Sequence, residues 1–298
     1  MLQNWISAFR LRTLPLSLAC VGMGAILAID FDSFDGLVFF LCCLVTLCLQ
    51  ILSNLSNDYG DAVNGIDNHD RIGPKRAVQS GNISKQQMKY AVIVFTLLSL
   101  FSGIGLLFVS FGSNWQPMLV FFGLGILCIV ASIGYTVGRR PYGYLGLGDI
   151  SVMIFFGGVG VMGTLFLFTH EFHYISILPA MSCGFFSVAV ININNIRDIE
   201  SDKKYGKLSL PVRMGKKNAT LYHWFLLSSG IIVATVWTLM TYKSAWQFIY
   251  LATIPLLIVN GRAISNKPAT ALDSYLRQMA LTTLLFVVLC GVGVILKF

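Results

Sequence analysis

Charged residues are scarce in this chain of 298 residues. Asp, Glu, Lys and Arg together make up 11% of it, 56% of the residues are hydrophobic, and the mean hydropathy is +0.74. A typical soluble domain carries roughly a quarter charged residues. So little charge cannot cover a surface that faces water, which excludes an ordinary soluble globular protein and a disordered chain. An integral membrane protein is the class that remains.

Two further absences narrow the class. The seven cysteines all lie inside apolar runs, their number is odd, and no Cys-x-x-Cys spacing occurs. We therefore expect neither a disulfide framework nor a zinc site. A linker rich in Gly, Pro or Ser is also missing, so residues 1–298 are expected to form a single membrane domain.

What the chain does contain is a series of apolar runs of membrane-spanning length. They fall at residues 14–30, 36–56, 89–110, 117–138, 145–169, 174–195, 221–241, 245–264 and 278–296. None alternates polar and apolar residues as a membrane strand would. The sequence thus predicts an all-α integral membrane protein with about nine transmembrane helices.

The basic residues are distributed unevenly between the connecting loops. The loops at 57–88, 139–144 and 196–220 are basic, whereas those at 31–35, 111–116, 170–173 and 242–244 are nearly free of Lys and Arg. Because cytoplasmic loops collect Lys and Arg, we place the N-terminus in the cytoplasm and the C-terminus outside. Only Lys243 and Lys297 then fall outside, so 19 of the 21 basic residues lie inside. This topology accounts for the net charge of +8 without a nucleic-acid partner.

Acidic residues accompany the bases in two of these loops. The spacing Asn-x-x-x-Asp occurs at 57/61 and again at 194/198, each time at the cytoplasmic end of an apolar run. Residues four apart share a helix face, so Asn194, Asp198 and Asp202 would form one stripe. Hard oxygen ligands of this kind suit Mg²⁺ together with substrate phosphates. Two such stripes could face each other and hold metal ions that bridge a diphosphate. One such motif alone is equally well explained by solvated ion pairs; two on the same side favour a shared site.

Neighbouring residues suit a diphosphate held by such ions. Asp67 follows Asp61 by six residues, so if both serve one site the helix must end or unwind between them, which Gly60 and Gly65 would allow. Cations for the diphosphate are predicted at Arg71, Lys75, Arg76 and Arg139. Asp149 begins a predicted span, where a carboxylate is a functional candidate; an interfacial position with a polar partner is the alternative.

These motifs resemble the intramembrane aromatic prenyltransferases of the UbiA type. The likeness includes Arg12-Thr13-Leu14-Pro15, Asn57-Asp58-Tyr59-Gly60-Asp61, Asp70-Arg71-Ile72-Gly73-Pro74, Gly146-Leu147-Gly148-Asp149, Phe155-Phe156-Gly157 and Asn194-Asn195-Ile196-Arg197-Asp198. It is nearest to the bacterial branch that prenylates 1,4-dihydroxy-2-naphthoate. The wider family commonly has NDxxDxxxD, but here Gly65 stands where the last Asp would be, and Asp67 comes two residues later.

The resemblance implies nine transmembrane helices around a central cavity in the bacterial inner membrane, with the active site on the cytoplasmic side. It implies Mg²⁺, a polyprenyl diphosphate and an aromatic acid acceptor, which loses CO₂ to give demethylmenaquinol for menaquinone biosynthesis. Asp61 and Asp198 would be catalytic, and the Mg²⁺ would be held by Asp58, Asp61, Asp198 and Asp202. Asn57 and Asn194 would assist at the diphosphate. Tyr135 and Asp149 would shield the allylic cation or orient the acceptor, and Arg12 would attract its carboxylate.

Two alternatives remain open on the sequence. Enzymes of the same family that prenylate 4-hydroxybenzoate or haem would share both Asp motifs. A secondary transporter of an anionic solute would also carry ionisable residues, but near the middle of the membrane. This chain has almost all of its charge at cytoplasmic helix ends, which argues against the transporter.

Overall fold

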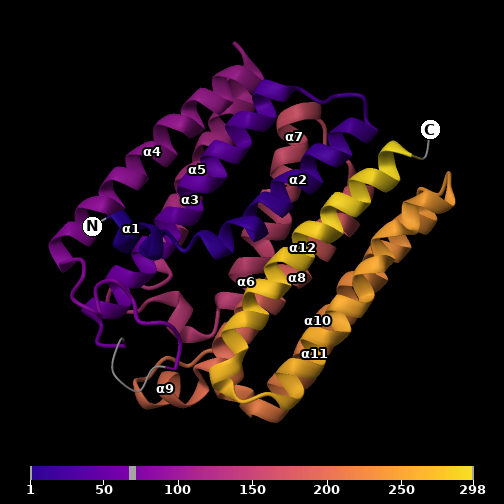
Figure 1. The fold of residues 1–298 in the computed structure, drawn as a ribbon. Helices are drawn as coiled ribbons and strands as arrows, with labels where there is room; N and C mark the ends of the chain where they lie inside the picture. The colour runs from indigo at the N-terminus through magenta and orange to yellow at the C-terminus, as the bar shows by residue number, and fades with distance from the viewer. Residues whose placement is uncertain (1, 67–71, 297–298) are drawn as a thin grey trace.

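The computed structural model describes residues 2–66 and 72–296, and within those ranges all regular secondary structure is helical (Figure 1). Nine helical segments there are long and apolar enough to cross a membrane. They are Leu2–Asp30, Gly36–Val63, Lys85–Phe111, Trp115–Gly134, Gly148–Thr169, Tyr174–Arg197, Leu210–Met240, Ala245–Asn266 and Ala269–Ile295. The predicted all-α, multi-pass membrane architecture is confirmed.

The helices follow one another with short connections. The α-helices are α1 (Leu2–Phe9), α2 (Leu14–Asp30), α3 (Gly36–Val63), α4 (Lys85–Phe111), α5 (Trp115–Gly134), α6 (Gly148–Val152), α7 (Thr164–Thr169), α8 (Ile177–Arg197), α9 (Ile199–Lys204), α10 (Leu210–Met240), α11 (Ile254–Asn266) and α12 (Leu272–Ile295). Between α6 and α7 lies η3 (Met153–Gly163), a π-helix. Five 3₁₀ segments complete the set: η1 (Leu11–Thr13), η2 (Tyr142–Leu145), η4 (Tyr174–Ser176), η5 (Ala245–Thr253) and η6 (Ala269–Ala271).

Local sequence signals explain where α3 and α4 begin. The Asp35 carboxylate accepts hydrogen bonds from the backbone N–H groups of Leu37 and Val38 and so caps α3. Ser84 and Gln87 form a reciprocal capping box at the start of α4. Both arrangements satisfy N–H groups that the first turn of a helix leaves without partners.

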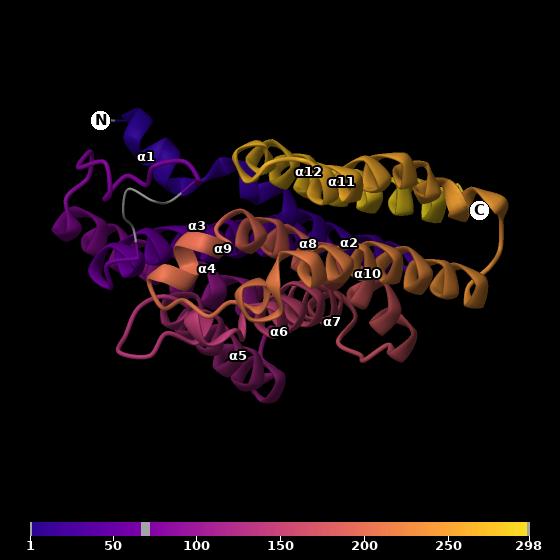
Figure 2. The ribbon, with the colours of Figure 1, turned by 90° about the horizontal axis from the view of Figure 1, so that it is seen from below.

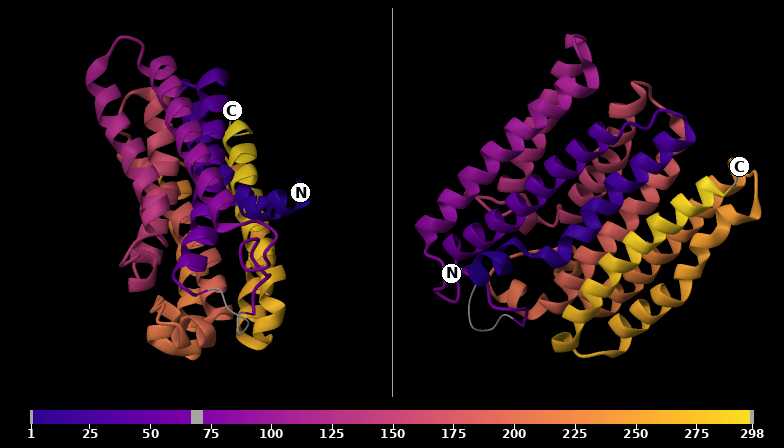
Figure 3. Two further views of the ribbon diagram at one scale, coloured as in Figure 1. Left: turned by 90° about the vertical axis from the view of Figure 1, so that its left-hand side faces the viewer. Right: turned by 45° about the horizontal axis from the view of Figure 1, so that its top comes forward.

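The bundle is organised around α8. This helix packs against α10, η3 and α12, while α3 packs against α4, and α2 packs against α12. Seen from below, α11 and α12 lie on one side of α2 and α8, and α5 lies on the other (Figure 2). In Figure 3, α9 lies at one end of the bundle and the C-terminus at the opposite end. The described residues on either side of 67–71 also lie at the α9 end (Figure 1), and we call this the motif end.

The fifth span departs from a regular α-helix. Its middle is the π-helix η3, a geometry that is rare and often found at functional sites. Gly157 lets this segment pack directly on α8, because a Cβ atom at that position would lie 2.7 Å from the carbonyl oxygen of Ala180. The neighbouring side chains of η3, including Phe155 and Phe156, line a cavity inside the bundle.

Candidate active site

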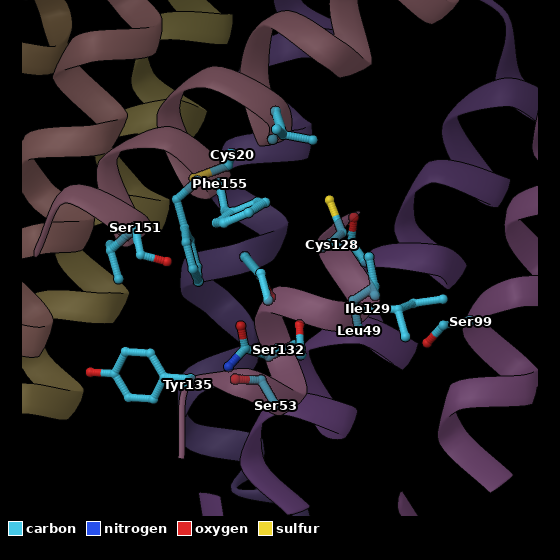
Figure 4. A pocket seen from close by; sticks show the side chains of 18 of the residues that line it. Cys20, Leu49, Ser53, Ser99, Cys128, Ile129, Ser132, Tyr135, Ser151 and Phe155 are labelled. Carbon is cyan, nitrogen blue, oxygen red and sulfur yellow. The ribbon is translucent and has the colours of Figure 1, made fainter. Parts of the chain in front are cut away.

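A cavity of about 380 Å³ lies inside the bundle. It is lined by side chains from α2, α3, α4, α5, η3 and α8, and its interior wall is largely apolar, with Leu49, Ile129 and Phe155 among the residues in Figure 4. Towards the motif end the lining becomes polar and charged. The lining residues at that end include Asn57, Asp61, Tyr135, Arg76, Asn194 and Lys207.

The first Asp motif occupies the last turns of α3. The helix ends at Val63, and Gly65 adopts a φ of +74°, so the predicted helix end between Asp61 and residue 67 is confirmed. Asp61 is 2% exposed, forms an ion pair with Arg76 and accepts a hydrogen bond from the Tyr144 hydroxyl. Arg76 also donates to the backbone carbonyl of Asn57 over 2.8 Å. Asp61 therefore faces the cavity with a cation already beside it.

Asp58 has a different environment from Asp61. Its two carboxylate oxygens accept hydrogen bonds from the backbone N–H groups of Ala77 and Val78, at 3.1 and 3.3 Å. It borders a second cavity of about 260 Å³, next to the first, which is lined with cations from several segments. Those cations are Arg10, Arg12, Lys75 and Arg76. Asp58 thus holds the loop after α3 in place.

The second Asp motif is divided by a helix break. α8 ends at Arg197 and α9 begins at Ile199, so Asp198 lies between two helices rather than inside the continuous helix expected from the spacing. Arg197 binds Asp198 through two hydrogen bonds of 2.9 and 2.7 Å. It also donates to Oδ1 of Asn194 over 2.7 Å and to Asp273 of α12 over 2.8 Å. Arg197, itself 2% exposed, holds this end of α8 together.

The end of α9 brings Lys207 back to Asp202. Gly206 adopts a φ of +79°, and the N–H of Lys207 donates to the carbonyl of Asp202 over 2.9 Å, as in a Schellman motif. Nζ of Lys207 then lies 2.9 Å from Oδ2 of Asp202, in a contact that is an ion pair rather than a well-directed hydrogen bond. Both side chains are buried.

Three motif carboxylates thus have basic partners of their own, which are Arg76, Arg197 and Lys207. The charges of Asp61 and Asp198 also act on Asp202. Burial raises the pKa of Asp202, and the charge of Lys207 opposes that rise. Because the bases offset the acids, the buried cluster carries no large net charge.

Two further predicted residues lie near the cluster. Tyr135 lines the cavity and packs edge-on against Tyr142, with ring centroids 5.3 Å apart. Burial, followed by the charge of Asp149, raises the pKa of Tyr135, so the phenol stays protonated. Asp149 is 6% exposed, but it is not among the described residues that line either cavity.

The remaining predicted residues have varied positions. Arg12 lines the second cavity and forms an ion pair with Asp273, and Lys75 lines the same cavity. Arg139 is exposed and lines neither cavity among the described residues. Asp67 and Arg71 lie outside the described residues.

Several residues that contact the motif acids were not singled out from the sequence. Tyr144 and Arg197 bind Asp61 and Asp198, and Lys207 pairs with Asp202. Thr136 was not singled out either, and it contacts the backbone beside the first motif rather than an acid, because its hydroxyl donates to the Ser56 carbonyl. The sequence did contain a signal for Lys207. Gly206 directly precedes it, and a glycine that ends a short helix can turn the next residue back towards that helix. Tyr144 gave no such signal, because it lies 83 residues from Asp61.

The donor set at the motif end is suited to Mg²⁺. Within residues 2–66 and 72–296, no three His, Cys, Asp or Glu side chains converge as a ready-made metal cluster. Mg²⁺ is usually bound by one or two carboxylates, with water and substrate phosphates completing its shell. Asp61 and Asp202 offer such carboxylates, and the buried Oδ2 of Asp202 has no well-directed hydrogen bond among the described residues. The residues present therefore fit the ion.

Comparison with known proteins identifies the family. The model of the UbiA prenyltransferase family matches residues 17–284, most of the chain. The chain belongs to the UbiA prenyltransferase family. The 1,4-dihydroxy-2-naphthoate octaprenyltransferase of Escherichia coli (strain K12) is 44% identical over 290 residues, which cover 96% of this chain and 94% of that protein. The protein of the same name from Mycobacterium tuberculosis is 31% identical, covering 95% and 94%.

Solved structures of UbiA homologues share the fold. The apo structure of a homologue from Aeropyrum pernix K1 has a TM-score of 0.70 at 17% identity and covers 96% of this chain and 98% of that chain. A homologue from Archaeoglobus fulgidus bound to GPP and Mg²⁺ has a TM-score of 0.60 at 18% identity and covers 97% and 99%. The helical arrangement of this UbiA family member is therefore that of its distant relatives.

Proposed function

We propose that this UbiA family member transfers a polyprenyl group from a polyprenyl diphosphate to 1,4-dihydroxy-2-naphthoate, with loss of CO₂, in menaquinone biosynthesis. The names of the bacterial relatives support this acceptor. The observation that carries the proposal is the cavity itself, because it joins a charged end to an apolar interior. A substrate with a diphosphate head and a hydrocarbon tail matches both parts.

The charged end offers hydrogen-bond donors to the diphosphate. Arg76 and Lys207 supply positive charge, and both line the cavity. Asn194 contributes its amide N–H₂, because a guanidinium can only donate and Arg197 therefore takes the amide oxygen. Charge-assisted hydrogen bonds of this kind stabilise the charge that grows on the diphosphate as the C–O bond breaks.

We assign the magnesium site to Asp61 and Asp202, with Asp198 beside them and Asn57 at the cavity wall. The Archaeoglobus fulgidus homologue is bound to GPP and Mg²⁺, which supports joint binding of the ion and a prenyl diphosphate. Mg²⁺ bound there neutralises charge on the leaving diphosphate as a Lewis acid. Asp58 serves the site indirectly, through its hydrogen bonds to the loop that carries Arg76.

The interior of the cavity protects the allylic cation left by ionisation. Leu49, Ile129 and Phe155 exclude water, so that a ring carbon of the acceptor rather than water attacks the cation. Tyr135 stays a neutral phenol beside the reacting groups. The cations of the second cavity, among them Arg12 and Lys75, would attract the carboxylate of the acceptor before it leaves as CO₂.

We also propose that the motif end faces the cytoplasm of a bacterial inner membrane. The excess of Lys and Arg in the loops at that end supports this orientation. Both substrates would then reach the site from the cytoplasmic side, with the tail in the bundle.

The test is turnover by the detergent-purified protein with a polyprenyl diphosphate and Mg²⁺. 1,4-Dihydroxy-2-naphthoate and 4-hydroxybenzoate are supplied in parallel reactions, and prenylated product is measured by mass spectrometry. We expect product with the naphthoate, release of CO₂, and loss of product in EDTA that added Mg²⁺ restores. A preference for 4-hydroxybenzoate would contradict the acceptor. The absence of product with every aromatic acceptor would contradict the enzyme assignment.

A further inference from the structure

Lys207 lies at the cavity wall in contact with Asp202. The lysine lines the cavity wall, whereas Asp202 is not among the described lining residues, and the two are joined by the 2.9 Å ion pair. A metal ion that reached Asp202 from the cavity would meet the ammonium group first. Building on the proposed function, we propose that Lys207 exchanges partners: it neutralises Asp202 before substrate binds, and it moves to the diphosphate when the metal ion takes its place.

The geometry of the pair allows this exchange. Lysine carries a compact charge on a flexible four-carbon stem, and the contact that joins Lys207 to Asp202 is the single one of 2.9 Å to Oδ2. The pair of Arg197 and Asp198 differs, because the guanidinium makes two hydrogen bonds to the carboxylate and others to Asn194 and Asp273. Of these two pairs, the lysine pair is the one that can open.

The backbone confines the movement to the side chain. The N–H of Lys207 is bound to the carbonyl of Asp202, and the N–H of Leu208 is bound to the carbonyl of Tyr144 over 2.9 Å. Gly206 supplies the left-handed turn that this arrangement requires. The lysine stem therefore stays anchored beside the cavity while its head group changes partner.

The electrostatic consequence is mutual dependence of the two ligands. A metal ion alone must displace Lys207 towards Asp61, a carboxylate that already pairs with Arg76. A diphosphate alone must draw the lysine away from a carboxylate that is then uncompensated. When both bind together, each charge finds an opposite partner. Mg²⁺ and the diphosphate should each bind weakly alone and strengthen one another, which is a coupling free energy between two ligands.

The test measures each ligand by itself in wild-type protein and in Lys207→Gln. The metal probe is Mn²⁺, followed by electron paramagnetic resonance without diphosphate. The diphosphate probe is non-cleavable geranyl thiodiphosphate, followed by calorimetry in EDTA. We expect Lys207→Gln to bind Mn²⁺ alone about tenfold more tightly and the thiodiphosphate alone about tenfold more weakly, within the usual range of such couplings. In wild-type protein, Mn²⁺ should strengthen the binding of the thiodiphosphate, after correction for the complex that the two form in buffer. In Lys207→Gln this strengthening should be smaller.

Two further variants serve as controls. Lys203→Gln removes the same charge from an exposed position on α9 and should leave both affinities unchanged. Lys207→Arg keeps the charge beside Asp202 and should bind Mn²⁺ alone no more tightly than wild type does, which also covers the case in which Lys207→Gln fails to fold. A Lys207→Arg protein that binds Mn²⁺ more tightly than wild type would overturn the exchange.

In Lys207→Gln the affinity for Mn²⁺ should rise while the affinity for the thiodiphosphate falls. This opposition distinguishes the exchange from a structural role of Lys207. If Lys207→Gln weakens the binding of both probes, or changes neither, the exchange is wrong, and turnover by the wild type leaves the proposed function standing. If wild-type protein forms no product with any aromatic acceptor, the proposed function fails, while the Mn²⁺ measurements still decide the exchange.

Discussion

Asp58 and Asp61 lie three residues apart on α3, yet their carboxylates have different partners. Asp58 accepts two backbone N–H groups of the loop after α3, whereas Asp61 faces the cavity beside Arg76 and Tyr144. The sequence identified both as ligand candidates because their residue type and position suit either role. Their partners come from other parts of the chain, so the difference between them appears only in three dimensions.

The two carboxylates should respond differently to the same substitution. Asp61→Asn removes a charge that faces the diphosphate, and we expect kcat/KM to fall by about 10²–10³. Asp58→Asn keeps one of the two oxygens that accept backbone N–H groups and should lower kcat/KM by less than about tenfold, or 1.4 kcal/mol. Steady-state kinetics with both substrates would check this. Equal losses in the two variants would show that Asp58 also takes part directly in the chemistry.

At the scale of the elements, the crossing of α3 with the end of α5 positions the first motif. A Cβ atom on Gly60 would lie 2.5 Å from the carbonyl oxygen of Thr136. The Thr136 hydroxyl donates to the Ser56 carbonyl over 2.9 Å, and the Asn64 amide donates to the Thr136 carbonyl over 2.9 Å. These contacts require a residue without a side chain at position 60.

Gly60→Ala should therefore separate the two helices and displace Asp61. We expect a lower midpoint of thermal unfolding in detergent, together with a loss of kcat/KM. Gly105→Ala is the matched control, because a Cβ at that position of α4 meets nothing within 4 Å. It should be neutral or slightly stabilising, since alanine favours a helix by up to about 1 kcal/mol over glycine. A stable, active Gly60→Ala protein would contradict this account of the crossing.

The nine spans could be predicted because each coincides with an apolar run, and the end of α3 could be predicted from Gly60 and Gly65. The π-helix η3 could not, because an apolar segment in a membrane offers no polar–apolar contrast to reveal its period. The break at Asp198 was also missed. The i, i+4 hydrogen bonds continue through the break. The N–H of Asp198 donates to the carbonyl of Asn194, and the N–H of Asp202 donates to the carbonyl of Asp198.

At the scale of the whole molecule, the orientation in the membrane stays a prediction that reporter fusions can test. With the motif end in the cytoplasm, green fluorescent protein joined to the N-terminus should fluoresce. Alkaline phosphatase joined to the C-terminus should be active outside, because it matures only beyond the inner membrane. The reverse pattern would contradict the orientation drawn from the positions of Lys and Arg.

The first and last spans are joined at the motif end by Asp273. Its carboxylate binds Arg12 on one side and Arg197 on the other, and the Arg197 side chain is nearly fully buried. Asp273→Asn should lower the free energy of unfolding by about 2 kcal/mol, the scale of hydrogen bonds to charged groups. Thermal unfolding in detergent would measure the loss. Asp32→Asn, at an exposed loop position, is the matched control and should change little.

This contact has a consequence for how the protein is made. Asp273 lies in the first turn of α12, which is synthesised after Arg12 and Arg197, yet its carboxylate completes the partners of both guanidinium groups. The early helices must enter the bilayer with these guanidinium groups still lacking that counter-ion. The motif end of the bundle can therefore reach its final arrangement of ion pairs only after α12 has been synthesised and inserted.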